Sequence, residues 1–151
     1  TKLMAEKYLL NQKKKINICI VRIFSYTSFN QDISFFIPSI YKKFLTNNFL
    51  KLDNMDHIRD FIDIRDIYSA IKLLYLKKYR GIYNLGSGKS IPLIKIVEHL
   101  ANLFKKKYII NKPNKQTKHV ANLSKIIKLG WKPKKSIVQI LNDYHLNFKK
   151  K

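Results

Sequence analysis

Hydrophobic positions along this chain switch between helical spacing and short continuous runs, and these switches predict its elements. Helical spacing predicts helices over residues 1–12, 35–45, 67–76, 93–104, 123–129 and 136–148. Short apolar runs predict strands over residues 16–24, 61–64, 82–85 and 108–110, with a loop or short strand at 47–56. Helices that alternate with strands are typical of an α/β fold.

The run at residues 16–24 says most about the sheet. It is short, β-branched and apolar at both alternations, as expected of a parallel strand buried between helices. Cys19, the one cysteine of the chain, is expected to fill the core there, and a lone cysteine excludes an internal disulfide. Residues 25–32 follow as a polar loop, and open α/β sheets bind ligands at the carboxyl ends of such strands.

The chain is strongly basic, with 31 lysines and arginines against 9 acidic residues and a net charge of +22. This charge raises the hypothesis of a basic nucleic-acid-binding module. Only four of the basic residues are arginines, although arginine is the side chain suited to bidentate contacts with phosphates and bases. The scattered lysines favour a solvated surface with no nucleic acid as partner, and the nucleic-acid module stays as an alternative.

Hydropathy predicts no membrane span, because no apolar stretch reaches the roughly 18–20 residues that one needs. A reduced cysteine and the lack of a signal peptide predict a cytoplasmic protein. The chain begins at Thr1 without a methionine and already in helical pattern, so we expect a portion of a longer protein.

Two motifs suggest phosphate or metal binding, and each has a simpler structural interpretation. Residues 86–90, Gly-Ser-Gly-Lys-Ser, end like a phosphate-binding loop, but that signature needs a glycine where Tyr83 stands. A tight turn is the preferred interpretation. The four histidines are widely spaced and have no second cysteine beside them, so no metal site is predicted.

Three aspartates spaced three residues apart, Asp60, Asp63 and Asp66, could suggest acid/base or metal chemistry. Their spacing also fits a strand, a turn and a helix cap, with Asp66 as the cap. The flanking Arg59 and Arg65 are then expected to be their charge partners. We prefer this structural interpretation.

Five segments of the chain carry motifs in a fixed order. Residues 1–6 look like the end of a Tyr-x-x-x-Lys helix, residues 59–67 read Arg-Asp-Phe-Ile-Asp-Ile-Arg-Asp-Ile, and residues 81–88 read Gly-Ile-Tyr-Asn-Leu-Gly-Ser-Gly. Together with residues 21–26 and 121–133, they resemble the extended short-chain dehydrogenase/reductase family of NAD-dependent sugar-nucleotide epimerases and dehydratases. The resemblance covers essentially the whole chain.

The resemblance implies a role for five residues. Lys2 would assist a catalytic tyrosine three residues before Thr1 and hold the ribose of the nicotinamide, whereas the simpler alternative is an exposed lysine near a chain end. Phe24 would lie against the nicotinamide, or else only pack in the core, and Ser25 would face the sugar. Arg59 and Lys112 would bind the nucleotide diphosphate, with a salt bridge to a neighbouring aspartate as the alternative for Arg59.

The resemblance also implies the architecture: the carboxyl-terminal part of a Rossmann-like parallel sheet interleaved with a small substrate-binding subdomain. Residues 1–151 would lack the amino-terminal dinucleotide-binding half, which would leave residues 16–24 with an exposed edge and the fragment alone inactive. The whole enzyme, a homodimer, would use NAD or NADP to epimerise, dehydrate or reduce a nucleotide-diphosphate sugar. Family motifs are altered at Ser25, Thr27 and Lys112, so a catalytically inactive remnant is a further alternative.

Overall fold

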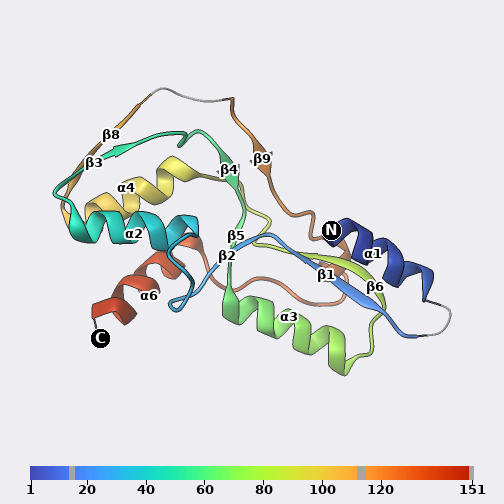
Figure 1. Cartoon of the computed structure of the whole chain (residues 1–151). Coiled ribbons are helices and arrows are strands. Elements are labelled where there is room, and N and C mark those ends of the chain that lie inside the picture. Colours follow the sequence, from blue (N-terminus) through green and yellow to red (C-terminus); the bar gives the residue numbers. More distant parts are fainter. Residues whose placement is uncertain (14–15, 112–114, 150–151) are drawn as a thin grey trace.

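The computed structural model describes residues 1–13, 16–111 and 115–149, in which helices and strands alternate (Figure 1). The helices are α1 (Lys2–Asn11), α2 (Phe36–Thr46), α3 (Ile64–Leu76), α4 (Leu93–Phe104), α5 (Ser124–Ile127) and α6 (Ile137–Lys149). The strands are β1 (Cys19–Ile23), β2 (Ser25–Thr27), β3 (Phe49–Leu52), β4 (Ile58–Arg59), β5 (Phe61–Asp63), β6 (Gly81–Leu85), β7 (Ile91–Pro92), β8 (Lys107–Ile110) and β9 (Lys118–His119).

Most strand pairs are parallel, which confirms the predicted α/β class. Strand β1 pairs with β6, β2 with β5, and β3 with β8, each in parallel. Strand β4 lies between β7 and β9, antiparallel to the first and parallel to the second. Because parallel strands need crossover connections, helices such as α3 separate the paired strands along the chain.

Buried apolar side chains form two clusters. The larger one joins α2, α4 and α6 with β3, and Phe44, Ile96 and Leu100 at its centre have no exposed surface. The second cluster packs α3 against β6 and α5, around Leu85 and Ile126. Figure 1 shows the same division, with α2, α4 and α6 gathered at one end and α3, β1 and β6 at the other. No described helix is long and apolar enough to cross a membrane.

The prediction that residues 16–24 form a strand buried on both faces is wrong in extent and in burial. Strand β1 begins only at Cys19, whose side chain is exposed rather than part of the core, and Ile23 is 44% exposed. Among the described residues β1 pairs only with β6, so its other edge is open. The run is apolar, as predicted, but a strand is buried only when other elements cover it, and the described residues supply no second strand beside β1.

The cap of α3 also differs from the prediction. The helix begins at Ile64, three residues earlier than expected, because Asp63 rather than Asp66 is the cap and accepts the backbone N–H of Arg65 at 2.8 Å. Asp66 lies in the first turn and accepts the backbone N–H groups of Lys134 and Lys135, both at 3.0 Å. It therefore ties the carboxyl-terminal segment to α3.

Candidate functional site

The chain changes strand partners between Phe24 and Ser25, and the candidate site lies at this point. The backbone N–H of Phe24 donates to the carbonyl of Leu85 at 2.9 Å, which extends the pairing of β1 with β6 by one residue. Ser25 starts β2 and lies opposite Phe61 of β5. The carboxyl end of β1 is therefore the place where two parallel pairs diverge, the position at which α/β sheets bind ligands.

A cavity of about 700 Å³ opens at this divergence. It brings together Phe24, Ser25 and Arg59, three of the predicted site residues, with Lys118 and His119 of β9. A second cavity, of about 270 Å³, shares the same three predicted residues and extends toward aromatic side chains of α2 and β5. Residues that are far apart in the sequence and were predicted separately thus line the same two cavities.

Within residues 1–13, 16–111 and 115–149, Arg59 forms no ion pair with an aspartate, the alternative that the sequence left open. Its Nη1 donates to the carbonyls of Ile58, at 2.9 Å, and Thr117, at 3.0 Å, and its Nη2 donates to the Thr117 hydroxyl at 3.0 Å. All three acceptors are uncharged, so the positive charge is not neutralised by a carboxylate. Among the described residues Nε and one hydrogen of Nη2 have no partner, which leaves one bidentate edge of the guanidinium available. Lys112 lies outside the described residues.

Strand β9 contributes two residues to the cavity lining that the sequence did not predict there. His119, one of the four widely spaced histidines, lies opposite Arg59 in the parallel register and lines the cavity, as does Lys118. The Arg59 hydrogen bonds to Thr117 hold this strand in place, and the backbone N–H of Thr117 also donates to Nδ1 of His57 at 3.2 Å. The one signal was their place just before the motif at residues 121–125.

Asp60, the residue after Arg59, holds two backbone segments together, one at Ser87 and Gly88 and the other at Ala121. Its carboxylate is fully buried. Oδ1 accepts the backbone N–H and the hydroxyl of Ser87, each at 2.6 Å, and Oδ2 accepts the backbone N–H groups of Gly88 and Ala121 at 2.9 and 3.1 Å. A Cβ on Gly86 would come within 2.7 Å of the Ala121 Cβ and closer still to Asp60. The Gly-x-Gly segment is therefore a tight turn around a carboxylate.

Lys2 is exposed at the start of α1 and, among the described residues, is not part of the cavity lining. Glu6 of the same helix accepts hydrogen bonds from the Arg22 guanidinium of β1, and these bonds lower the pKa of Glu6. Figure 1 shows α1 and β1 running in opposite directions. Lys2 and Phe24 therefore lie on the same side of this ion pair. Lys2 is about 6 Å from Glu6 along the helix, and Phe24 is about 7 Å from Arg22 along the strand.

Comparison with known protein families identifies the family of the chain. The sequence model of the NAD dependent epimerase/dehydratase family matches residues 1–86, more than half of the chain. The chain belongs to this family. No curated protein matches the sequence significantly. Family membership agrees with the resemblance drawn from the motifs, and the match includes Lys2, Phe24, Ser25 and Arg59.

Solved structures share the fold of this family member. RMD from Pseudomonas aeruginosa, solved with NADPH, is 25% identical with a TM-score of 0.84, over 97% of this chain and 55% of its own. The UDP-glucose 4-epimerase of Thermotoga maritima, with UDP-glucose, is 19% identical with a TM-score of 0.82, over 99% and 52%. The dTDP-glucose 4,6-dehydratase of Bacillus anthracis, with NAD, is 22% identical with a TM-score of 0.79, over 94% and 48%. The chain spans about half the length of each.

Proposed function

We propose that the chain is the carboxyl-terminal part of an NAD(P)-dependent enzyme that epimerises, dehydrates or reduces the sugar of a nucleotide-diphosphate sugar. The observation that carries the proposal is the cavity at the end of β1, where Phe24, Ser25 and Arg59 meet Lys118 and His119. Family membership supports it, as do the NADPH, NAD and UDP-glucose bound to structures of similar fold.

The cations of the cavity suit a diphosphate. Among the described residues neither Arg59 nor Lys118 has a carboxylate partner, so each presents a whole positive charge. The free edge of Arg59 matches two phosphate oxygens, which is the strongest geometry for such a contact. The cavity volume of about 700 Å³ lies within the range of roughly 300–1,000 Å³ of small-molecule sites. Arg59, Lys118 and, as the family motif implies, Lys112 would bind the diphosphate.

The cofactor side of the site depends on the end of β1 and the start of α1. NAD or NADP would take a hydride from the sugar or return it. The Phe24 ring would cover one face of the nicotinamide and exclude water, while the Ser25 hydroxyl would bind a hydroxyl of the sugar. Lys2 would hold the ribose, and its ammonium would stabilise the phenolate of a tyrosine one helical turn earlier, lowering that tyrosine's pKa.

We also propose that residues 1–151 pack against a dinucleotide-binding half that this chain does not contain. Strand β1 has an open edge, and beside it a groove of about 380 Å³ is lined by Cys19, Val21, Ile71 and Tyr75. Helix α1 buries no residue. A parallel strand added from the missing half would pair the open edge of β1, and apolar residues beside it would cover the groove and α1. Open strand edges and large apolar patches are usually covered in folded proteins. On this proposal the chain alone binds ligands but does not catalyse.

The first experiment measures binding of UDP, GDP and dTDP to the 151-residue chain by calorimetry. We expect saturable binding of one of them, weakened about 10- to 100-fold by Arg59→Ala, the size of a lost hydrogen bond to a charged group. Arg80→Ala is the matched control, because it removes the same charge from an exposed position outside the cavity. Equal affinities of the two variants would contradict the assignment of the diphosphate to this cavity.

The same variants test the alternative of a nucleic-acid module. Binding to DNA or RNA that weakens steeply with salt would favour a general polyanion surface, provided that Arg59→Ala and Arg80→Ala reduce the affinity equally. For the inactive remnant, the discriminating measurement is turnover of nucleotide sugars by the chain joined to its upstream coding sequence. Turnover would exclude the remnant, whereas binding without turnover by the complete enzyme would support it.

A further inference from the structure

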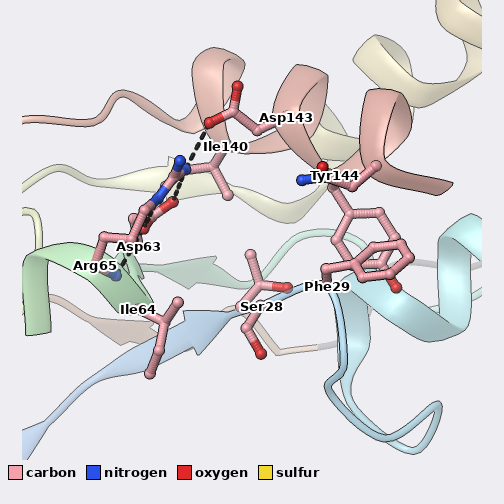
Figure 2. Close-up of a pocket in the computed structure, with 10 residues that line it drawn as sticks. Ser28, Phe29, Asp63, Ile64, Arg65, Ile140, Asp143 and Tyr144 are labelled. Atoms are coloured by element: carbon pink, nitrogen blue, oxygen red, sulfur yellow. Dashed lines mark hydrogen bonds and ion pairs between the residues drawn. The ribbon is translucent and has the colours of Figure 1, made fainter. Parts of the chain in front are cut away.

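A separate cavity, of about 210 Å³, lies between the end of β2, the start of α3 and the middle of α6 (Figure 2). It shares no lining residue with the two cavities around Phe24. The volume is below the roughly 300–1,000 Å³ of sites for drug-sized ligands, so it suits a smaller organic molecule. Neither the proposed function nor its site uses this cavity.

Thr27 of β2 carries the first observation. Its side chain lines the cavity and is only 2% exposed, and among the described residues its hydroxyl has no hydrogen-bond partner. Its neighbour in the register, Asp63, does not bond it: the two Asp63 oxygens are instead oriented toward Arg65, from which each accepts at 2.7 Å. Since a buried hydroxyl without a partner destabilises the fold, the position is suited to a ligand that supplies the bond.

The charged wall of the cavity is balanced. Arg65 donates to Asp63 and to Asp143, and Lys135 donates to Asp143 at 3.2 Å. Two cations thus pair with two carboxylates, although Lys135 itself does not line the cavity, and Figure 2 shows the Asp63, Arg65 and Asp143 side chains joined along one side. Neither an anion nor a cation gains from a wall whose charges cancel, so the complementary ligand is uncharged.

The opposite wall is aromatic. The rings of Phe29 and Tyr144 meet edge to face with centroids 5.9 Å apart, and Figure 2 shows them across the cavity from Arg65, with Ser28 between the two walls. A molecule held here meets hydroxyl and amide groups of Thr27, Ser28 and Asn147 on some sides and ring carbons on another. Groups that both donate and accept suit hydroxyls, and ring carbons suit C–H groups.

We propose that this cavity binds a small uncharged polyhydroxy molecule, a free polyol or monosaccharide, and that a small rotation of the Thr27 side chain lets its Oγ1 bond one of the ligand's hydroxyls. The molecule is distinct from the nucleotide-linked sugar of the proposed function, because the two cavities have no lining residue in common. The inference does not depend on the enzymatic proposal, and either can fail alone.

The test is an NMR titration of the ¹⁵N-labelled 151-residue protein with glycerol and with D-glucose as probes. We expect saturable shifts of Ser28, Ile64 and Asn147 amides with at least one probe. Thr27→Val keeps the shape but removes the hydroxyl, so it should weaken binding about 2- to 12-fold. In the absence of a probe it should raise Tm, because a partnerless buried hydroxyl becomes a methyl group. The control Thr46→Val changes an exposed hydroxyl that bonds Lys42 and should leave the affinity unchanged.

Several outcomes would overturn the inference. They are the absence of saturation by either probe, equal affinity of Thr27→Val and Thr46→Val, and a lowered Tm of Thr27→Val, which would give the hydroxyl a structural role. Saturation by inorganic sulfate but not by the neutral probes would identify an anion site instead. If Thr27→Val fails to fold, Asn147→Ala removes an exposed lining amide on α6 and should also weaken binding.

Discussion

Replacing Asp60 with asparagine should destabilise the protein by about 2–4 kcal/mol. The side chain has the same shape, but one of its oxygens becomes an NH₂ donor. On the Oδ2 side that donor would face the N–H groups of Gly88 and Ala121; on the Oδ1 side it would face the N–H of Ser87, whose hydroxyl can turn to accept. The better orientation therefore leaves one buried N–H unpaired, at about 1–3 kcal/mol, and weakens the two bonds that lose a charged acceptor.

Urea unfolding followed by circular dichroism measures this loss. For an m-value of about 2 kcal/mol/M, the Asp60→Asn midpoint should fall by about 1–2 M. Asp53→Asn makes the same chemical change at an exposed position and should leave the midpoint near that of the wild type. If both variants unfold at the same urea concentration, the carboxylate does not hold the turn, and the account of Gly86–Gly88 as a structural motif is wrong.

Two further predictions concern acid stability and the start of α1. Hydrogen bonds from Arg65 and then Lys135 lower the pKa of Asp143 below 3.8, so its stabilisation is present above that pH and is lost as the pH falls through the lower folded value. Asp143→Asn should therefore reduce the loss of urea stability between about pH 5 and pH 2, and an unchanged acid profile would refute this. In the chain joined to its upstream sequence, Lys2→Met should lower kcat about 10²- to 10⁴-fold. Lys7→Met, an exposed lysine of the same helix, should not.

Periodicity predicted α2, α3, α4 and α6 because each keeps one apolar stripe over several turns. In α4 the buried residues Ile96, Val97, Leu100 and Ala101 recur at helical spacing, and the predicted span of residues 93–104 is the observed one. Strands β2, β4, β7 and β9 have two or three residues each, too few for an alternation to show. They are defined by the strands beside them, so the polar segment that begins at Ser25 was expected to be a loop although it starts β2.

Candidate site residues could be predicted only where a motif or a strand end marked them. Phe24 and Arg59 were predicted in this way, and the structure brings them to one cavity. His119 was missed because it reaches that cavity through the register of β9 with β4, a pairing between segments about 60 residues apart that no local pattern encodes. The exposure of Cys19 was not predicted for a related reason. A β-branched run indicates a strand that other elements usually cover, but it does not show whether those elements lie within these residues.

Arg59 and Asp60, adjacent in sequence, bind different parts of the molecule, and this allows scaffold and site to be tested separately. Arg59 holds Thr117 while keeping one edge toward the cavity, whereas Asp60 is buried and holds Gly88 and Ala121. Asp60→Asn removes none of the cations that line the cavity, so its folded molecules should still bind the nucleotide diphosphate, although the folded fraction is smaller. Arg59→Ala should have the reverse profile, with weaker nucleotide binding and a smaller change in stability. If the two substitutions reduced affinity and stability in the same proportion, Arg59 would serve only to fix β9, and its assignment to the diphosphate would fail.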